Sequence, residues 1–442
     1  MTKEIYFFAG IGGIGMSALA RHLHRKGVAV FGFDRQPSKV STQLAAEGIV
    51  ITYSDRPEEL PERIQKAENL EVIYTPALAA NHPLLNFFRA KNFTLRKRSE
   101  LLQAISANYQ TLAVAGTHGK TTTSALLTHL LRSCGQSPTA FLGGLISGDE
   151  TNYYAGESNL CVVEADEFDR SFLRLKPAAG IITSVEPDHL DIYGTEAAYR
   201  QAFEAFQKLI EGPCIVHQQT ALPGITYGGK SASHRIEQLR IAEGSYLFEW
   251  HGPGFVQAVE MRYPGLHNLH NALAAMALCA ENGLPPEQIA QALPSFPGVW
   301  RRMEKLYSGE GRWYYDDYAH HPGELKALIQ SLKEWHPKLK LTLVFQPHLY
   351  SRTRDFLDGF AEALSAVDQL ILLPIYPARE EPIPGVSSEV LLEKCSVSRQ
   401  LLVEKDQLLS TLETWRPELL VTAGAGDIDR WVQPIAKMMA SW

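Results

Sequence analysis

The segment that most constrains this chain is the run Gly116-Thr-His-Gly-Lys-Thr-Thr-Thr123, which stands between the apolar run 111–115 and the helix-like run 124–131. In such a turn, successive backbone N–H groups surround phosphate oxygens, the lysine neutralises the β- and γ-phosphates, and the first threonine hydroxyl binds Mg²⁺. The run is shorter than the common phosphate-loop pattern, because Val114 stands where that pattern has its first glycine. Strand, loop and helix together predict a triphosphate site on an α/β sheet. The residues expected to bind ATP there are Gly116, Thr117, His118, Gly119, Lys120, Thr121 and Thr122.

A second glycine loop lies near the N-terminus, between the apolar run 5–9 and a helical run. Its glycines are Gly10, Gly12, Gly13 and Gly15. They match G-x-G-x-x-G, in which glycines let the backbone and the helix N-terminus approach a diphosphate. Asp34 ends the next strand and is expected to accept a hydrogen bond from a ribose hydroxyl. Alone, the loop is consistent with NAD, FAD or another nucleotide diphosphate, and also with a turn needed only for close helix–strand packing.

Acidic residues follow two apolar runs downstream of the phosphate loop. Glu164-Ala-Asp-Glu-Phe-Asp169 follows one run, and His189 lies in the acidic segment that follows the next. Open α/β sheets place their sites at the carboxyl ends of strands, and Mg²⁺ prefers oxygen ligands. We therefore expect Glu164 and Thr121 to bind Mg²⁺ and His189 to bind a second ion. The acids after Glu164 are equally consistent with a solvated loop.

The alternation of apolar and helical runs occurs three times, which predicts an α/β protein of three domains. Boundaries near residues 108 and 300 give a Rossmann-like domain at 1–107, a central phosphate-loop domain with a parallel or mixed sheet at 108–300, and a Rossmann-like domain at 301–442. Between residues 221 and 265 we expect short antiparallel strands, because that segment is polar and rich in turn residues.

Composition excludes some classes of partner. The chain has 442 residues, a formal charge of −7 and no basic block, which argues against binding nucleic acid or an anionic membrane. Its five cysteines are scattered, as in proteins that keep free thiols in a reducing compartment. The N-terminus lacks the apolar core of a signal peptide, and no apolar run is long enough to span a membrane. These observations predict a cytoplasmic protein.

The motifs, taken in order, resemble those of the Mur ligase family. Besides the two glycine loops, they are E-A-D-E at 164–167, E-x-D-H-x-D at 186–191, P-G-x-H-N-x-x-N at 264–271 and D-D-Y-x-H-H-P at 316–322. The resemblance covers essentially the whole chain. It implies an ATP-dependent ligase that converts a carboxylate to an acyl phosphate and joins it to an amine. The segments 345–355 and 375–385 are most similar to the branch that adds L-alanine to UDP-N-acetylmuramate during cytoplasmic synthesis of peptidoglycan precursors.

The resemblance also implies roles for single residues. The N-terminal glycines would bind UDP rather than NAD, and two Mg²⁺ ions would be present. Asn271 would contact adenine, Arg302 the γ-phosphate and Asp317 the ribose of ATP. The residues alone favour a different interpretation of the segment around Asn271, a helix N-terminus rich in capping side chains. The residues expected to face the amino acid and the reacting carboxylate are Tyr318, His320, His348 and Arg352. The expected catalytic set is Lys120, His189, Arg302, His348 and Arg352.

The sequence departs from the family pattern at two places. Leu349 stands where many members have a basic residue, and Thr75-Pro-Ala77 replaces a serine pair in the N-terminal loop. Phe203 occupies the position of a modified lysine in other branches, so we expect no carbamylated lysine. The alternative functions are addition of a tripeptide or of another small amino acid, a dinucleotide-dependent oxidoreductase, and a regulatory ATPase. We expect only small-molecule partners and a monomer or homodimer.

Overall fold

The computed structural model describes residues 5–76, 78–188, 190–242, 244–378 and 380–442. The chain divides into two compact units. The first comprises Met1–Leu239, Phe248–Glu260 and His270–Phe296. The second comprises Arg240–Leu247, Met261–Leu269 and Pro297–Trp442. In the described part of the chain, no helix is both long and apolar enough to cross a membrane.

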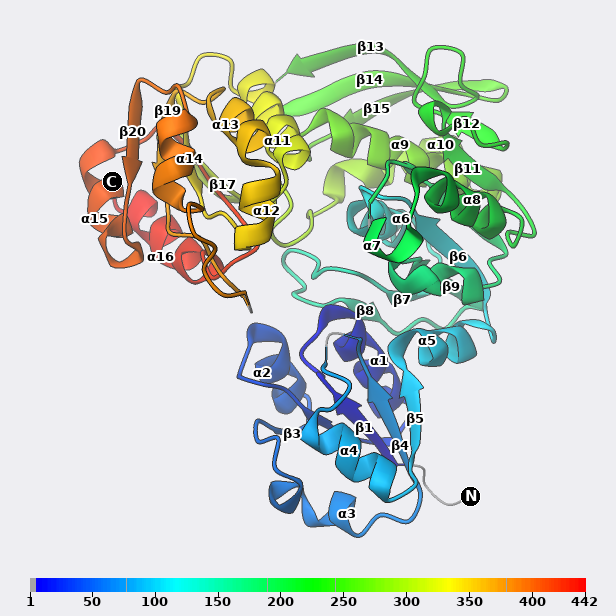
Figure 1. Cartoon of the computed structure of the whole chain (residues 1–442). Helices are drawn as coiled ribbons and strands as arrows, with labels where there is room; N and C mark the ends of the chain where they lie inside the picture. The colour runs from blue at the N-terminus through cyan, green and yellow to red at the C-terminus, as the bar shows by residue number, and fades with distance from the viewer. Residues whose placement is uncertain (1–4, 77, 189, 243, 379) are drawn as a thin grey trace. The chain divides into compact units, whose positions relative to one another are not determined.

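The first unit begins with a five-stranded parallel sheet in the order β3-β2-β1-β4-β5 (Figure 1). Its strands are β1 (Ile5–Ala9), β2 (Ala29–Phe33), β3 (Val50–Thr52), β4 (Leu70–Tyr74) and β5 (Thr94–Lys97). Its helices are α1 (Ile14–Arg25), α2 (Lys39–Ala46), α3 (Glu62–Gln65), α4 (Pro83–Ala90) and α5 (Arg98–Ser106). The central strand β1 is apolar throughout because helices cover a parallel sheet on both faces. Phe7 of β1 and Phe88 of α4 are fully buried in this core.

The same unit contains a seven-stranded sheet in the order β12-β11-β10-β6-β9-β7-β8. Its strands are β6 (Gln110–Ala115), β7 (Thr139–Phe141), β8 (Tyr153–Tyr154), β9 (Leu160–Glu164), β10 (Ala179–Ile182), β11 (Cys214–His217) and β12 (Ile225–Tyr227). The accompanying helices are α6 (Lys120–Ser133), α7 (Leu190–Tyr193), α8 (Glu196–Gln207), α9 (Leu266–Glu281) and α10 (Pro286–Ala292). The sheet is parallel except for the β7–β8 pair. Sequence reasoning was wrong about β12, which extends the parallel sheet beside β11 instead of forming an antiparallel hairpin.

A three-stranded sheet follows, with neighbours in the order β13-β14-β15. Its strands are β13 (Arg235–Ala242), β14 (Ser245–Gly252) and β15 (Phe255–Met261). At seven or eight residues each, they are longer than the short strands expected for this polar segment. Buried Tyr246 and Trp250 explain the length, because β14 presents a continuous apolar face.

The second unit is built on a six-stranded sheet in the order β16-β17-β21-β18-β19-β20, parallel except for the β16–β17 hairpin. Its strands are β16 (Glu304–Gly309), β17 (Arg312–Asp317), β18 (Leu341–Phe345), β19 (Gln369–Leu372), β20 (Arg399–Leu402) and β21 (Leu419–Ala423). Its helices are α11 (Pro322–Trp335), α12 (Tyr350–Asp355), α13 (Leu357–Leu364), α14 (Ser388–Lys394), α15 (Leu408–Trp415) and α16 (Asp429–Ala440). The helical pattern of residues 354–366 in the sequence predicts one helix there, but the structure has two, α12 and α13, which meet at the non-helical residue Phe356.

Candidate active site

The phosphate loop connects the end of β6 to the start of α6, as the sequence predicts. Gly116 and Gly119 have φ angles of 139° and 81°, a region that favours glycine. A Cβ on Gly116 would lie 1.9 Å from Oγ1 of Thr183, so the loop also needs glycine for space. Thr183 donates a 2.5 Å hydrogen bond to the carbonyl of His118, and the backbone N–H of His118 donates to Ser184 Oγ. The segment that follows β10 therefore fixes the main chain of the loop.

Lys120 is the first residue of α6, and its ammonium group donates hydrogen bonds to acceptors within the protein. Its Nζ donates to the carbonyls of Gly116 at 2.6 Å and Thr117 at 3.2 Å. It also forms an ion pair with Glu167, at 2.7 Å to Oε2. Glu167 is 1% exposed, and burial raises the pKa of its carboxyl more than Lys120 lowers it. The solvated-loop interpretation of the acids after Glu164 is therefore wrong for Glu167, because the chain turns inward at that residue.

Two of the three expected metal ligands lie in described parts of the fold. Glu164 is the last residue of β9, and Thr121 lies in the first turn of α6. A Cβ on Gly143 would lie 2.1 Å from Oε2 of Glu164, so glycine at that position leaves room for the carboxylate. A carboxylate and a hydroxyl are oxygen donors of the kind that Mg²⁺ prefers, so the residues fit that ion. His189 lies outside the described residues.

Asn271 lies beside the phosphate loop. A Cβ on Gly119 would lie 2.4 Å from Asn271 Oδ1, which places the carboxamide against the loop. Helix α9 begins at Leu266, so Asn271 lies inside the helix rather than at its N-terminus. This excludes the capping interpretation for Asn271, because only residues at the helix start can cap it.

The N-terminal glycine loop is held by β2 and by the residue that follows it. The backbone N–H groups of Gly10 and Ile11 donate to the carbonyl of Phe33 at 2.8 and 2.9 Å. The N–H of Gly12 donates to Asp34 Oδ2 at 2.6 Å, and the N–H of Arg35 donates to Oδ1 at 2.7 Å. In the structure, both carboxylate oxygens of Asp34 thus accept bonds from the main chain, so its observed contribution is to shape the loop.

Arg98, the first residue of α5, was missed by sequence reasoning. A Cβ on Gly15 would lie 2.2 Å from Nη1 of Arg98, so the guanidinium packs against the start of α1. Arg98 also pairs with Asp166 at 3.3 Å. The sequence does indicate this residue, because the basic pair Lys97-Arg98 comes at the carboxyl end of a parallel strand, where such sheets bind ligands.

In the second unit, adjacent arginines at 301 and 302 have different environments. Arg301 is 4% exposed and donates to Asp316, which is fully buried, at 2.8 Å. The guanidinium of Arg302 lies over the ring of Tyr318, 5.4 Å from its centroid, and the residue is half-buried. Arg302 is thus the arginine with access to a ligand. Asp317 accepts hydrogen bonds from the backbone N–H groups of Met303 and Ala319 at 2.6 and 2.7 Å, and burial raises its pKa.

The four residues expected to face the amino acid and carboxylate are adjacent to one another. The rings of Tyr318 and His320 have centroids 5.2 Å apart, and those of His320 and His348 are 6.1 Å apart. Nη1 of Arg352 lies 3.3 Å from Nδ1 of His348. They converge because β17 and β18 are parallel strands flanking β21, so the segments after their carboxyl ends emerge at the same edge of the sheet.

The structure distinguishes the two neighbouring histidines of the D-D-Y-x-H-H-P motif. His321 is the N-cap of α11, where its Nδ1 accepts the N–H of Gly323, and its ring packs on Phe356 with centroids 4.5 Å apart. His320 instead contacts Tyr318 and His348. Burial lowers the pKa of His320, although Glu324 and the carbonyl of Tyr318 act in the opposite direction. His320 is therefore the histidine of the pair that lies with the other residues expected to face the amino acid.

Leu349, where the sequence departs from the family pattern, has a φ of 70°. This conformation is rare for a residue with a side chain, and such strain is usually offset by surrounding contacts. Here the N–H of Leu349 donates to the carbonyl of Tyr376 at 2.9 Å, and Thr353 donates its hydroxyl to the Leu349 carbonyl at 2.8 Å. The strained backbone joins β18 to α12 and thereby positions His348 beside Arg352.

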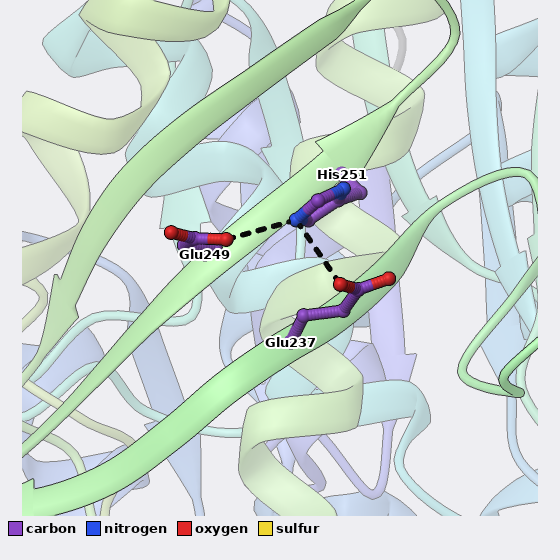
Figure 2. A group of neighbouring side chains, drawn as sticks. All are labelled: Glu237, Glu249 and His251. Atoms are coloured by element: carbon purple, nitrogen blue, oxygen red, sulfur yellow. Dashed lines mark hydrogen bonds and ion pairs between the residues drawn. The ribbon is translucent and has the colours of Figure 1, made fainter.

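A separate group of potential metal ligands lies on β13 and β14, where Glu237, Glu249 and His251 converge (Figure 2). Nε2 of His251 lies 3.1 Å from Glu249 and 3.5 Å from Glu237. A histidine bound to a metal usually donates its other ring N–H to an acceptor. Here Nδ1 faces a donor, Nη2 of Arg235, at 3.3 Å. We interpret the group as a surface ion-pair cluster rather than a metal site.

Comparison with known proteins gives matches along almost the whole chain. The Mur ligase family catalytic domain matches residues 5–110, the Mur ligase middle domain residues 114–279, and the Mur ligase glutamate ligase domain residues 301–427. The UDP-N-acetylmuramate–L-alanine ligase of Porphyromonas gingivalis is 43% identical over 452 residues, covering 99% of each chain. The enzyme of the same name from Flavobacterium johnsoniae is 42% identical and covers 99% of this chain and 98% of its own.

Solved structures show the same fold. The UDP-N-acetylmuramate–alanine ligase of Thermotoga maritima superposes with a TM-score of 0.86 at 27% identity, covering 99% of both chains. A murein peptide ligase from Psychrobacter arcticus has a TM-score of 0.72 at 21% identity, also over 99% of both chains. These matches confirm the expected three-domain α/β architecture.

Proposed function

This chain belongs to the Mur ligase family, and we propose that it joins L-alanine to UDP-N-acetylmuramate with hydrolysis of ATP to ADP and phosphate. The reaction is a step in the synthesis of peptidoglycan precursors. The observation that carries the proposal is the likeness, over nearly the full length of both chains, to curated ligases of that specificity. The three-domain division at 1–107, 108–300 and 301–442 is part of the same proposal.

The chemistry proceeds in two displacements. The muramyl carboxylate attacks the γ-phosphorus of ATP, which forms an acyl phosphate and releases ADP. The amine of L-alanine then attacks the acyl carbon, an amide bond forms, and inorganic phosphate leaves. The enzyme needs no side-chain nucleophile, because positioning and charge neutralisation carry phosphoryl transfer.

On the first unit, the phosphate loop supplies the groups for ATP. Backbone N–H groups of the loop bind phosphate oxygens, and Lys120 neutralises the charge that develops during transfer. Asn271 lies against the loop at Gly119 and is assigned to the nucleotide. Thr121, Glu164 and His189 would hold Mg²⁺, which would stabilise charge on the phosphate oxygens. The glycines at 10–15 are assigned to the diphosphate of the UDP-linked acid, with Arg98 beside Gly15 as an additional cation.

On the second unit, Arg352 is suited to the carboxylate group of an amino acid. Its planar guanidinium binds a carboxylate through two hydrogen bonds. His320, His348 and Tyr318 surround that position with polar ring atoms, and burial lowers the pKa of both imidazoles. Neutral imidazoles place no second positive charge beside Arg352 and so do not repel it. Arg302 and Asp317 are assigned to the γ-phosphate and the ribose of ATP.

The alternatives explain less of the chain. A dinucleotide-dependent oxidoreductase accounts for the N-terminal glycine loop but leaves the phosphate loop and Lys120 without a role. A regulatory ATPase accounts for Lys120 but not for the cluster of Tyr318, His320, His348 and Arg352. Addition of glycine, L-serine or a tripeptide uses the same chemistry, so the amino acid must be tested directly. We place the reaction in the cytoplasm, in keeping with the five free thiols.

One assay distinguishes these functions. ADP release is measured with UDP-N-acetylmuramate and ATP while the acceptor is varied among L-alanine, glycine, L-serine and a tripeptide. L-alanine should give the highest kcat/KM. Turnover with the tripeptide but with none of the amino acids would assign the chain to peptide recycling. ADP release at the same rate with and without UDP-N-acetylmuramate would indicate an ATPase. Consumption of a nicotinamide cofactor would overturn the proposal.

A further inference from the structure

The ammonium group of Lys120 uses all its donors within the protein. An ammonium has three N–H donors and no acceptor. In the structure, these point to the carbonyls of Gly116 and Thr117 and to the carboxylate of Glu167. A phosphate oxygen that binds Lys120 must therefore replace one of these three acceptors.

Glu167 is the acceptor that a phosphate would replace. The two carbonyls belong to the loop itself, whose main chain is fixed by Thr183 and Ser184. Glu167 is the acceptor that carries a charge, and its Oε2 lies 2.7 Å from Lys120 Nζ. An anionic phosphate and an anionic carboxylate attract the same ammonium, so they compete for it.

Replacement of Glu167 by a phosphate oxygen at Lys120 costs free energy, because Glu167 is buried. The residue is 1% exposed, and the hydroxyl of Tyr193 fixes its backbone by donating to its carbonyl at 2.6 Å. Lys120 lowers the pKa of this carboxyl, whereas burial and Asp166 raise it. When Lys120 moves to a phosphate, a buried carboxylate loses a charge partner, and breaking a buried pair is costly. That cost reduces the apparent affinity for the nucleotide.

We propose that Glu167 competes with the phosphates of ATP for Lys120 and thereby sets the affinity of the phosphate loop for nucleotide. Glu167 is a positioning residue, because it acts through Lys120 and touches no reacting atom. The inference rests on the proposed function only in taking ATP as the ligand of the loop. Within the E-A-D-E segment, Glu164 is already assigned to the metal, and the inference adds a role for the last acid, Glu167.

The test is equilibrium binding of a β,γ-imido analogue of ATP, measured by calorimetry on the full chain. Glu167→Gln keeps the shape of the side chain and removes its charge, so the analogue should bind about tenfold more tightly than to wild type. Asp166→Asn is the matched control, because it removes the same charge from the same loop without a contact to Lys120; its effect should stay below about threefold. Thermal unfolding verifies that each variant is folded.

A double-mutant cycle shows whether Glu167 acts through Lys120. Adding Glu167→Gln to a Lys120→Met background should leave analogue binding unchanged, because the competition no longer exists. An equal effect in both backgrounds would overturn the proposal, since Glu167 would then act by another route. Weaker binding caused by Glu167→Gln only when Lys120 is present would also overturn it, because Glu167 would then orient Lys120 towards the phosphates.

Two further results would be interpreted differently: a Glu167→Gln variant that does not fold, and a wild-type chain that does not bind the analogue. If Glu167→Gln does not fold, Glu167→Asp withdraws the carboxylate by one methylene and should give a smaller gain in affinity; unchanged or weaker binding would contradict the competition. If wild type binds no analogue at all, the failure belongs to the assignment of the loop to ATP, and the proposed function falls before the role of Glu167 is tested.

Discussion

Nδ1 of His348 lies 3.3 Å from Nη1 of Arg352, four residues further along the chain. Burial, and after it the charge of Arg352, lowers the pKa of His348 to about 4. At neutral pH the imidazole is therefore uncharged and does not repel the guanidinium of Arg352.

This arrangement predicts a loss of stability in mild acid. The folded-state pKa of about 4 lies below the ordinary histidine value of 6.5, so between these pH values the unfolded chain binds more protons. Stability should fall as pH decreases from 6.5 towards 4, and burial lowers the pKa of His22, His217 and His336 to about 4 as well. Melting temperatures at pH 7 and pH 5 measure the effect. The decrease should be smaller in His348→Gln, and an identical decrease would contradict the pKa shift of His348.

Replacement of Lys120 should abolish most of the activity. Lys120→Ala removes the cation that neutralises developing phosphate charge, and turnover should fall by at least ~10³-fold. Exposed Lys338 provides the control, since Lys338→Ala removes the same charge from the turn that precedes β18 in the second unit and should leave ADP release unchanged. Near-wild-type turnover in Lys120→Ala would show that the loop does not bind ATP for catalysis.

The two neighbouring arginines should separate stability from activity. Arg301→Met leaves buried Asp316 without its ion pair, which should reduce the free energy of unfolding by about 3–5 kcal/mol. Arg302→Met removes a half-buried cation that lies over the Tyr318 ring and acts on the buried carboxyl of Asp317, so its stability cost should be smaller, about 1 kcal/mol. Its turnover should nevertheless fall by about 10²–10³-fold if Arg302 stabilises transferred phosphate. Denaturant unfolding and ADP release on both variants check the contrast, and the reverse pattern would exchange their roles.

Gly116 should tolerate no side chain. In Gly116→Ala the new Cβ meets Thr183 and the backbone of Ser184 as well as an unfavourable φ, so we expect a loss of about 2–4 kcal/mol and weakened binding of an ATP analogue. Gly135 has a φ of 80°, and among the described residues no atom lies within 4 Å of the place that its Cβ would take. Gly135→Ala should therefore cost about 1 kcal/mol and spare nucleotide binding. Equal losses in the two variants would mean that conformation alone, and not crowding, requires glycine at 116.

Substitutions of His320 and His321 should also have different effects, one on activity and the other on stability. His320→Ala should lower turnover, because His320 lies with Tyr318 and His348. His321→Ala should remove an N-cap from α11 and cost about 1 kcal/mol of stability with little loss of kcat. Steady-state kinetics and thermal unfolding on each variant decide the assignment. A catalytic defect confined to His321→Ala would reverse it.

Much of this protein is determined locally and was therefore predictable from the sequence. The apolar runs 5–9 and 111–115 lie within a residue of the observed bounds of β1 and β6, because a buried parallel strand is apolar on both faces. Both glycine loops were found in their strand–helix context, since positive φ angles and close backbone approach demand glycine. The resemblance carried by several ordered motifs supplied the family, which the comparisons confirm.

Tertiary structure decided what the side chains do, because contacts between distant residues leave no periodic trace in a sequence. Only the fold shows that Glu167 is buried against Lys120, 47 residues earlier, although it stands in an acidic run that looks solvated. Only the fold separates Arg301 from Arg302 and His320 from His321, since neighbouring residues of the same type differ solely in the direction of their side chains. The local sequence pattern specifies the glycine-rich phosphate loop. Long-range packing determines that Glu167 is the carboxylate that pairs with Lys120 of that loop.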